Sequence, residues 1–422
     1  MMKEILDARE ERSQLLREFV NKFPVVIIKA NLPGLDKNPK LAYFLVDLFR
    51  REVGRTLKIH RDAFHEGPDG PWWLLEAEGG PDEIKTQLVD IEDFHGLGRL
   101  IDLDVFDTNL IGLSRRDLGL LSRSCLLCEL PAHFCVRNQT HSLEELISKI
   151  NWMVNDYLRQ EITGAVEQAM TEEIKLEPKF GLVTETSSGS HHDMDSRLME
   201  LSKKALLGPF TEMFFAGYNA TEFAPAFENA KALGIKAEAK MFAVTKGINT
   251  YKGLIFIMGT VLFSLGRCFW ENDFSLFSRI SKIGQIFLSD LTKLTNPTTA
   301  GEWAYQRYGI SGIKGETAGG MPNVRKVMPM LDEFTRVELH RALICLIGSV
   351  DDTVLLKRCG EREKYEEVRK LIGGLDPNNL TELAAVTDKC VSEQLSFGGS
   401  ADLLIIALFL RKIEKKFNFQ FS

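Results

Sequence analysis

The sequence predicts two domains: an α+β domain with a mixed sheet over residues 1–160, followed by an all-α domain over residues 161–422. A chain of 422 residues is long enough for at least two hydrophobic cores. In the first part, short β-branched and aromatic runs alternate with helical segments. In the second part, apolar residues recur at helical spacing and strand-type alternation is nearly absent. Because no Pro-, Gly- or Ser-rich linker separates the parts, we expect the boundary inside a helix near residues 158–163.

The elements of the first part follow from local patterns. A helix is expected over residues 4–23, ending before Pro24, and another over about residues 39–53. Strands are expected at residues 25–28, 57–59, 72–77 and around Asp102. The pattern of residues 84–94 fits either a helix or a strand. Ser142 and Glu145 form a capping box that should begin a helix reaching about residue 173, whole or broken near Gly164.

The second part should consist of helices joined by polar loops. Apolar periodicity predicts helices over residues 196–207, 221–233, 237–245, 251–269, 273–294, 325–348, 362–372, 380–391 and 400–417. The run 253–266 is the most apolar, but it is shorter than the ~20 residues of a membrane span and is expected to be a buried core helix.

Composition narrows the location and the partners. A net charge of −7 argues against nucleic acid as a partner. The charged N-terminus lacks the apolar segment of a signal peptide. Seven cysteines without framework spacing are typical of a reducing compartment. We therefore expect a cytoplasmic protein that does not bind membranes.

Candidate catalytic and metal-ligating side chains are most concentrated in residues 98–141. Ile101, Leu103 and Val105 alternate with Asp102 and Asp104, so in a strand both carboxylates share one face, roughly 6.5–7 Å apart at Cα. That spacing suits Mg²⁺ with a polyphosphate, although a solvated sheet face gives the same alternation. Arginine forks suit phosphate oxygens, and four of them flank the pair: Arg99, Arg115, Arg116 and Arg123.

A set of soft metal ligands follows this strand. Cys125, Cys128, Cys135 and His141 fall within 17 residues. Three thiolates and one imidazole are a ligand set typical of structural Zn²⁺. A CxxC pair can also arise by chance, so the sequence leaves both interpretations open.

Loops at helix starts carry the polar residues of the second part. Asp195 is a natural N-cap, while Asp193 and Asp195 could share a metal from an extended approach. Helix N-termini favour phosphate. Loop 247–253 brings Asn249 and Lys252 to the start of the apolar helix, where the lysine either reaches solvent or pairs with phosphate.

Further loops complete this set. Residues 309–320 are rich enough in glycine for a backbone nest around phosphate, but they lack the order of a P-loop. Residues 351–353 and 398–402 are acidic loops in which Ser400 can cap the final helix and Asp402 lies in its first turn. Together the loops suggest a Mg²⁺–polyphosphate site on a helical scaffold.

These motifs resemble two known families. The first part resembles the citrate lyase holo-acyl-carrier-protein synthase over most of residues 10–158. The shared pieces are LPG…KN near residues 32–38, GRL-x-D-x-DV, SRR-x-L and R-x-CLLC…A-x-x-C-x-R…H. The second part resembles the triphosphoribosyl-dephospho-coenzyme A synthase. Its pieces are EPKFGLV at 177–183, GSHHDMD at 189–195, GINTYKG at 247–253, GETAGG at 315–320, DDT at 351–353 and LSFGGSADLL at 395–404. The chain looks like a fusion of both.

For the second part, the resemblance implies ribosyl transfer from ATP. The 2′-hydroxyl of 3′-dephospho-coenzyme A would attack the anomeric carbon and expel adenine, while Mg²⁺ holds the triphosphate. The resemblance implies metal or base roles for Asp193, Asp195, Asp352 and Asp402. It implies substrate or phosphate contacts for His191, Asn249, Lys252, Glu316 and Ser400.

For the first part, the resemblance implies transfer of that product to a serine of the acyl-carrier (gamma) subunit of citrate lyase, with release of pyrophosphate. The family is similar to nucleotidyltransferases, so Asp102 and Asp104 would bind Mg²⁺ in line with the scissile phosphate. The implied phosphate ligands are Lys37, Arg99, Arg115 and Arg116. The cysteines would build a structural zinc site, because phosphodiester formation needs no thiol.

The second part departs from the family at several positions. Thr184, Glu185 and Ser187 stand where the family has Asp, Arg and Asn, Tyr251 replaces a His, and Gln394 replaces an Asn. Two alternatives therefore stay open. One is a zinc-containing nucleotide-binding or scaffold protein with an inactive second half. The other is the same chemistry serving malonate decarboxylase.

Overall fold

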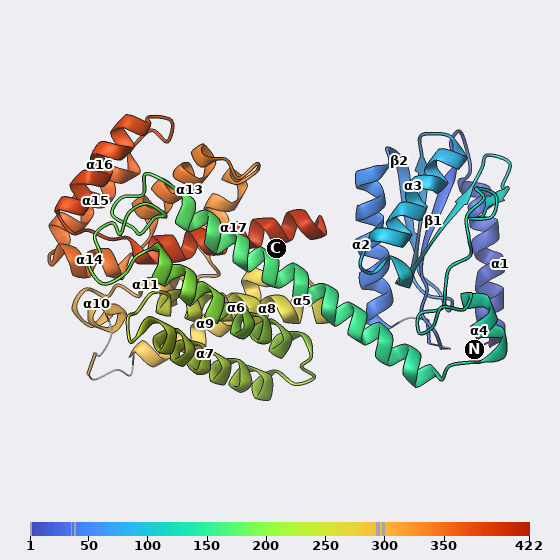
Figure 1. Ribbon diagram of the computed structural model, residues 1–422, viewed down its shortest axis with the longest axis horizontal. Helices are drawn as coiled ribbons and strands as arrows, with labels where there is room; N and C mark the ends of the chain where they lie inside the picture. Colours follow the sequence, from blue (N-terminus) through green and yellow to red (C-terminus); the bar gives the residue numbers. More distant parts are fainter. Residues whose placement is uncertain (1, 35, 38, 293–295, 298–299) are drawn as a thin grey trace. The chain divides into compact units, whose positions relative to one another are not determined.

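The computed structural model describes residues 2–34, 36–37, 39–292, 296–297 and 300–422. The chain forms two compact units, Met1–Gln160 (unit 1) and Glu161–Ser422 (unit 2). Helix α5 (Leu143–Lys175) begins in unit 1 and ends in unit 2 (Figure 1). It runs unbroken through Gly164, and it begins with the expected capping box, in which Ser142 and Glu145 exchange hydrogen bonds.

Unit 1 is built on a five-stranded sheet with the order β2-β3-β1-β4-β5. The strands are β1 (Val25–Ala30), β2 (Ile59–His65), β3 (Trp72–Ala77), β4 (Ile101–Phe106) and β5 (Gly112–Leu113). Every described pair is antiparallel, so the expectation of a mixed sheet was wrong. The reason is that β3 turns back from β2 and inserts between β2 and β1. Strands that run in the same direction therefore never become neighbours.

Helices cover both faces of this sheet (Figure 1). Helix α1 (Met2–Phe19) packs on one face, where Leu16 joins Val25, Ile27, Trp72 and Leu74 in a buried cluster. Helices α2 (Lys40–Thr56) and α3 (Pro81–Phe94) lie on the other face. The 3₁₀ turn η1 (Gly98–Leu100) leads into β4, and α4 (Ala132–Asn138) precedes α5.

Every described regular element of unit 2 is helical, as predicted. The longer helices are α6 (Ser196–Tyr218), α7 (Phe223–Thr245), α8 (Lys252–Glu271), α9 (Leu276–Thr292), α13 (Arg336–Ser349), α15 (Arg362–Gly373), α16 (Leu380–Ser392) and α17 (Gly398–Phe417). The shorter ones are α10 (Ala300–Tyr308), α11 (Gly312–Ala318), α12 (Pro322–Val327), the 3₁₀ turn η2 (Met328–Met330) and α14 (Thr353–Cys359). By length and composition α8 could cross a membrane, but 72% of its apolar window is buried in the protein, as in a core helix.

Several predicted boundaries were wrong. The segments 221–233 and 237–245 form one helix, α7. The predicted helix 325–348 breaks at η2 and restarts at Thr335, whose side chain forms a capping box with Glu338. The Gly-rich segment 309–320 is not an open nest, because Gly312–Ala318 folds as α11. Helices as short as α10 and α14 carry too little periodicity to be predicted.

Candidate functional sites

The first candidate site is the aspartate pair of β4. The expected alternation is confirmed: Ile101, Leu103 and Val105 are buried, whereas Asp102 is half-buried and Asp104 is exposed. Asp102 is paired in register with Lys29 of β1, so this lysine lies on the same face as the carboxylates. Asp104 and Oδ2 of Asp102 have no hydrogen-bond or ion-pair partner among the described residues. Both carboxylates can therefore accept a cation.

Arg123 holds Asp102 in place. Its guanidinium donates to Asp102 Oδ1 at 2.9 Å and to the Ile101 carbonyl at 3.0 Å, and it also pairs with the buried Glu92 of α3. Asn31 Nδ2 donates to the same Asp102 oxygen at 3.3 Å. Burial raises the pKa of Asp102; the charge of Arg123 opposes this rise. The arginine therefore keeps the carboxylate oriented and favours its charged form.

A cluster of basic side chains lies near the end of β1. Lys29 and Arg12 of α1 both pair with the buried carboxylate of Asp69. Lys37 donates to the Leu32 carbonyl at 2.7 Å. Burial lowers the pKa of Lys29 and of Lys37, and the charge of Arg9 lowers both further. Sequence reasoning found Lys37 but missed Lys29, Arg12 and Asp69, because only the strand register and the packing of α1 bring them together.

The other expected arginines do not join the aspartate pair. Arg115 pairs with Glu92 and Asp93 of α3. Arg116 is exposed in the turn after β5. Arg99 donates to the Ser124 carbonyl and lines a cavity of about 280 Å³ beside Trp152. Asn38 of the LPG…KN motif lies outside the described residues.

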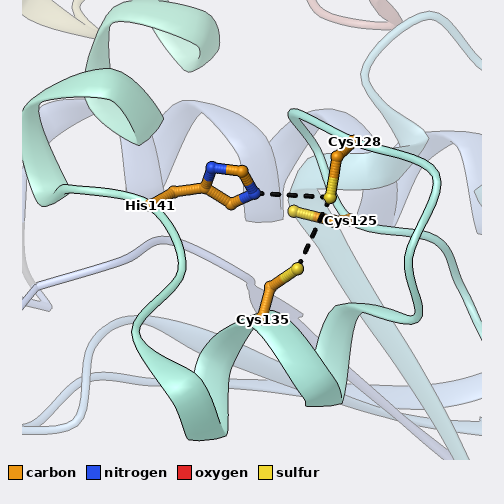
Figure 2. A group of neighbouring side chains, drawn as sticks. All are labelled: Cys125, Cys128, Cys135 and His141. Atoms are coloured by element: carbon orange, nitrogen blue, oxygen red, sulfur yellow. Dashed lines mark hydrogen bonds between the residues drawn. The ribbon is translucent and has the colours of Figure 1, made fainter.

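The cysteine–histidine group forms a compact cluster (Figure 2). The ligand atoms of Cys125, Cys128, Cys135 and His141 all lie within 4.8 Å of one another. Cys128 Sγ is 3.5 Å from Cys135 Sγ and 3.4 Å from His141 Nε2. All of these cysteines are free thiols. Thiolates bound tetrahedrally to Zn²⁺ at 2.3 Å would be about 3.8 Å apart, so the spacing fits such an ion.

Backbone amides support this cluster. The Leu127 N–H donates to Cys125 Sγ at 3.5 Å. Burial acts to raise the pKa of Cys125, but hydrogen bonds from the Leu127 and Cys128 amides bring it below the usual value. A hairpin bridge between Ser124 and Pro131 closes the loop that carries the CxxC pair. The lowered pKa of Cys125 favours the thiolate form, which is the form that binds metals.

In unit 2, hydrogen bonds occupy the acceptor sites of the Asp352 carboxylate. It is 1% exposed, and it accepts from the amides of Val354 and Leu355 at the start of α14. It also accepts from the amide and the hydroxyl of Ser400, at 2.8 and 3.0 Å. Four donors fill the roughly four acceptor sites of a carboxylate. Asp352 therefore joins α14 to α17, and the arrangement does not support the expected metal role.

Ser400 and Glu316 also have structural partners. Ser400 does not cap α17 as predicted, because α17 begins at Gly398 with Phe397 as its N-cap. The Glu316 carboxylate accepts two hydrogen bonds from Asn323 at the start of α12, one from its backbone amide and one from its side-chain Nδ2, at 2.8 Å each. Burial raises the pKa of Glu316, and these hydrogen bonds oppose the rise.

The loop before α6 holds His191, Asp193 and Asp195. Asp195 is the predicted N-cap, accepting from the Leu198 amide at 2.8 Å. Asp193 is 63% exposed, and its oxygen is 4.0 Å from His191 Nδ1. His191 contacts Ser396 Oγ at 3.0 Å, and burial together with the charge of a nearby arginine lowers its pKa. The structure thus brings His191 and Asp193 together, with Asp195 next to them on the chain.

The loop before α8 positions Asn249, Tyr251 and Lys252. Asn249 Oδ1 accepts from the Lys252 amide at 3.1 Å, and Lys252 Nζ pairs with Glu238 of α7 at 2.7 Å. Tyr251 is 3% exposed, and its hydroxyl has no hydrogen-bond partner in the described structure. Asp402 of α17 lies against Gly253, where a Cβ would collide with its Oδ2.

The diverged segment 184–187 forms a local turn. Thr184 is buried, and its hydroxyl accepts from the Ser187 amide at 3.1 Å. Glu185 is exposed. Gln394 lies near His192, with 3.3 Å between the side-chain nitrogens. The side chains at these diverged positions therefore form local turn and surface contacts.

Comparisons with known proteins match both units. Residues 1–157 match the CitX family, apo-citrate lyase phosphoribosyl-dephospho-CoA transferase, and residues 159–421 match the CitG family, ATP:dephospho-CoA triphosphoribosyl transferase. The chain is 31% identical to Protein CitXG of Leuconostoc mesenteroides subsp. cremoris, covering 97% of this chain and 96% of the relative. It is 30% identical to Protein CitXG of Haemophilus influenzae, covering 96% and 94%. A 2-(5''-triphosphoribosyl)-3'-dephosphocoenzyme-A synthase of Haemophilus ducreyi is 33% identical over 67% of this chain and 98% of its own length.

Proposed function

Because the chain belongs to the family of fused CitX–CitG proteins, we propose that its two units catalyse successive steps in making and attaching the prosthetic group of citrate lyase. The enzyme is a bifunctional transferase. Unit 2 converts ATP and 3'-dephospho-CoA to 2'-(5''-triphosphoribosyl)-3'-dephospho-CoA and adenine. Unit 1 transfers this product to a serine of the apo acyl-carrier protein and releases pyrophosphate. One observation carries the assignment: the two family matches meet at residues 157–159, beside the junction of the units at 160–161.

In unit 1, Asp102 and Asp104 are the proposed Mg²⁺ ligands. They share one face of the sheet and keep unpaired carboxylate oxygens, which are the ligands that Mg²⁺ prefers. When bound, Mg²⁺ would offset the negative charge of the phosphates around the reacting bond. Lys29, Arg12 and Lys37 supply positive charge beside the pair for the pyrophosphate that leaves. This arrangement supports a nucleotidyltransferase-like site.

The cysteine cluster is the proposed structural zinc site of unit 1. Three thiolates and one imidazole at tetrahedral spacing support Zn²⁺ over a harder metal. Bound zinc would hold the loop of Cys125 and Cys128, helix α4 and His141 together. Arg123 lies two residues before Cys125, so the same loop also positions the side chain that orients Asp102.

In unit 2, the loop before α6 is the proposed Mg²⁺–triphosphate site. Asp193 and Asp195 offer carboxylates beside His191, at the N-terminus of a long helix that favours anions. Asn249 and Lys252 begin α8 and are the proposed phosphate contacts, with Lys252 leaving Glu238 to do so.

The client and the compartment follow from the same proposal. The acyl-carrier gamma subunit of citrate lyase is the proposed acceptor, because the family matching unit 1 is described by its action on apo-citrate lyase. A reducing cytoplasm is proposed because all seven cysteines are free thiols.

Adenine release tests unit 2. The purified chain, supplied with ATP, 3'-dephospho-CoA and Mg²⁺, should release adenine that is measured by chromatography. No adenine would favour the alternative in which a diverged unit 2 serves only as a scaffold.

Labelling of the apo acyl-carrier protein tests unit 1. Supplied with the triphosphoribosyl intermediate, the chain should increase the mass of the acceptor by one prosthetic group. Asp102→Asn should abolish the increase, whereas Asp90→Asn, an exposed carboxylate on α3, should not. Labelling by Asp102→Asn at the native rate would remove Asp102 from the mechanism. Equal labelling of the malonate decarboxylase carrier would widen the client assignment.

A further inference from the structure

Two polar side chains without partners lie near the starts of α8 and α17. The Tyr251 hydroxyl is buried and unpaired, a situation that typically costs about 1–3 kcal/mol. Asp402 lies against Gly253 in the first turn of α8 and forms no hydrogen bond or ion pair with the residues that the structure describes. Asp402 is partly exposed, so a ligand can reach it. Native proteins seldom leave such groups unpaired, which points to a partner that the free chain lacks.

The neighbouring charges are already compensated. Glu173 of α5 pairs with Lys179 at 2.8 Å, and Glu200 of α6 pairs with Lys203 at 2.6 Å. Asp352 of α14 accepts four hydrogen bonds. Among the described charges around this point, the carboxyl of Asp402 is therefore the one left with neither a cation nor a donor.

These surroundings set the proton affinities of the two groups. Burial raises the pKa of Asp402 well above its usual value, and the charges of Glu173 and Asp352 raise it further. Burial likewise raises the pKa of Tyr251 well above 10, with Glu173 and Asp402 adding to the rise. At neutral pH the tyrosine remains a hydrogen-bond donor, and the aspartate is a stronger base than an exposed one.

We propose that Asp402 is the general base of triphosphoribosyl transfer and that Tyr251 positions the attacking hydroxyl by donating a hydrogen bond to its oxygen. This rests on the function proposed for unit 2. The 2'-oxygen of dephospho-CoA bonds to C1' of the ATP ribose as the C1'–N9 bond breaks. The electron pair of that bond leaves with adenine, which takes a proton from water. The hydroxyl proton passes to Asp402, which returns it to solvent and closes the proton balance.

The test measures adenine release by the full chain against pH at saturating substrates and Mg²⁺. Asp402→Asn should lower kcat about 10²–10⁴-fold and leave the KM for ATP nearly unchanged, because only the proton acceptor is lost. The acidic limb of the native kcat profile should disappear in this variant, and Asp402→Glu should restore part of the activity. Tyr251→Phe should lower kcat about tenfold, the effect of losing one hydrogen bond.

Matched controls separate chemistry from folding. Tyr218→Phe removes a hydroxyl from α6, and Asp388→Asn removes an exposed carboxylate from α16; both should keep native rates. Asp402→Asn should unfold at the native temperature or above it, because it removes a charge that has neither a cation nor a hydrogen-bond donor beside it. If Asp402→Asn unfolds at a lower temperature, the kcat profile of Asp402→Glu distinguishes a base from a structural residue. A glutamate that acts as the base must still produce an acidic limb in that profile.

The outcomes are distinguishable. A native chain that releases no adenine refutes the proposed function of unit 2. A native chain that is active, with Asp402→Asn within threefold of its rate, overturns the inference alone. Recovery of Asp402→Asn at tenfold higher Mg²⁺ also overturns it, because Asp402 would then be a metal ligand.

Discussion

Replacing Cys128 with serine should remove the metal from unit 1 and destabilise that unit selectively. Cys128 is the central ligand of the cluster, because its sulfur contacts both Cys135 Sγ, at 3.5 Å, and His141 Nε2, at 3.4 Å (Figure 2). A serine hydroxyl is a neutral, harder donor that does not replace a thiolate on Zn²⁺.

The expected magnitude follows from mass action. A ligand present at 1,000 times its Kd stabilises the folded state by about 4.1 kcal/mol. For a domain of 150–250 residues, each kcal/mol shifts Tm by about 2–4 °C. Loss of the metal from unit 1, which spans Met1–Gln160, should therefore lower its unfolding transition by about 8–16 °C. The transition of unit 2 should not move.

Calorimetry of the full chain and metal analysis by mass spectrometry check this prediction. The native chain should carry about one zinc per molecule, and Cys128→Ser should carry much less. Cys345→Ser, a half-buried cysteine of unit 2, is the matched control and should keep the metal. The reasoning fails if the native chain binds no metal, or if Cys128→Ser unfolds at the native temperature.

Three further changes test individual contacts. Lys179→Met leaves the buried Glu173 without its partner and should destabilise unit 2 by about 3–5 kcal/mol, measured by urea unfolding. An unchanged midpoint would show that the ion pair is dispensable. Burial lowers the pKa of His340, so the stability that this residue contributes is complete above the unfolded-state pKa near 6.5 and falls as the pH drops below it. His340→Gln should therefore reduce the loss of stability between pH 7.5 and 5.5. An equally steep loss in this variant would show that other groups cause it. Arg123→Lys should slow labelling of the carrier protein about tenfold, because lysine lacks the fork that contacts Asp102 and Glu92 at the same time. A native rate would leave the contact with Asp102 without a catalytic role.

Local periodicity predicted the parts of the fold that depend on neighbours in sequence. The alternation at Asp102 and Asp104 holds because a strand has a period of two. The Ser142 box and the Asp195 cap also hold, because a capping side chain bonds only amides within three residues. The cysteine spacing indicated a possible cluster for the same reason, because its four ligands lie within 17 residues of the chain.

The contacts that join distant segments could not be predicted. Lys29 and Asp102 meet through the register of β1 with β4, which the sequence does not specify. Asp352 looked like a metal ligand because its bonds to Ser400 cross 48 positions of the chain. The partnerless hydroxyl of Tyr251 is a property of tertiary packing, and no local pattern signals it.

The short distance along the chain between Arg123 and Cys125 has a physiological consequence. If the cluster binds the proposed zinc, oxidation of its cysteines or loss of the metal would loosen the segment that carries Arg123, whose guanidinium orients Asp102. Attachment of the prosthetic group would then slow through the lost orientation of Asp102.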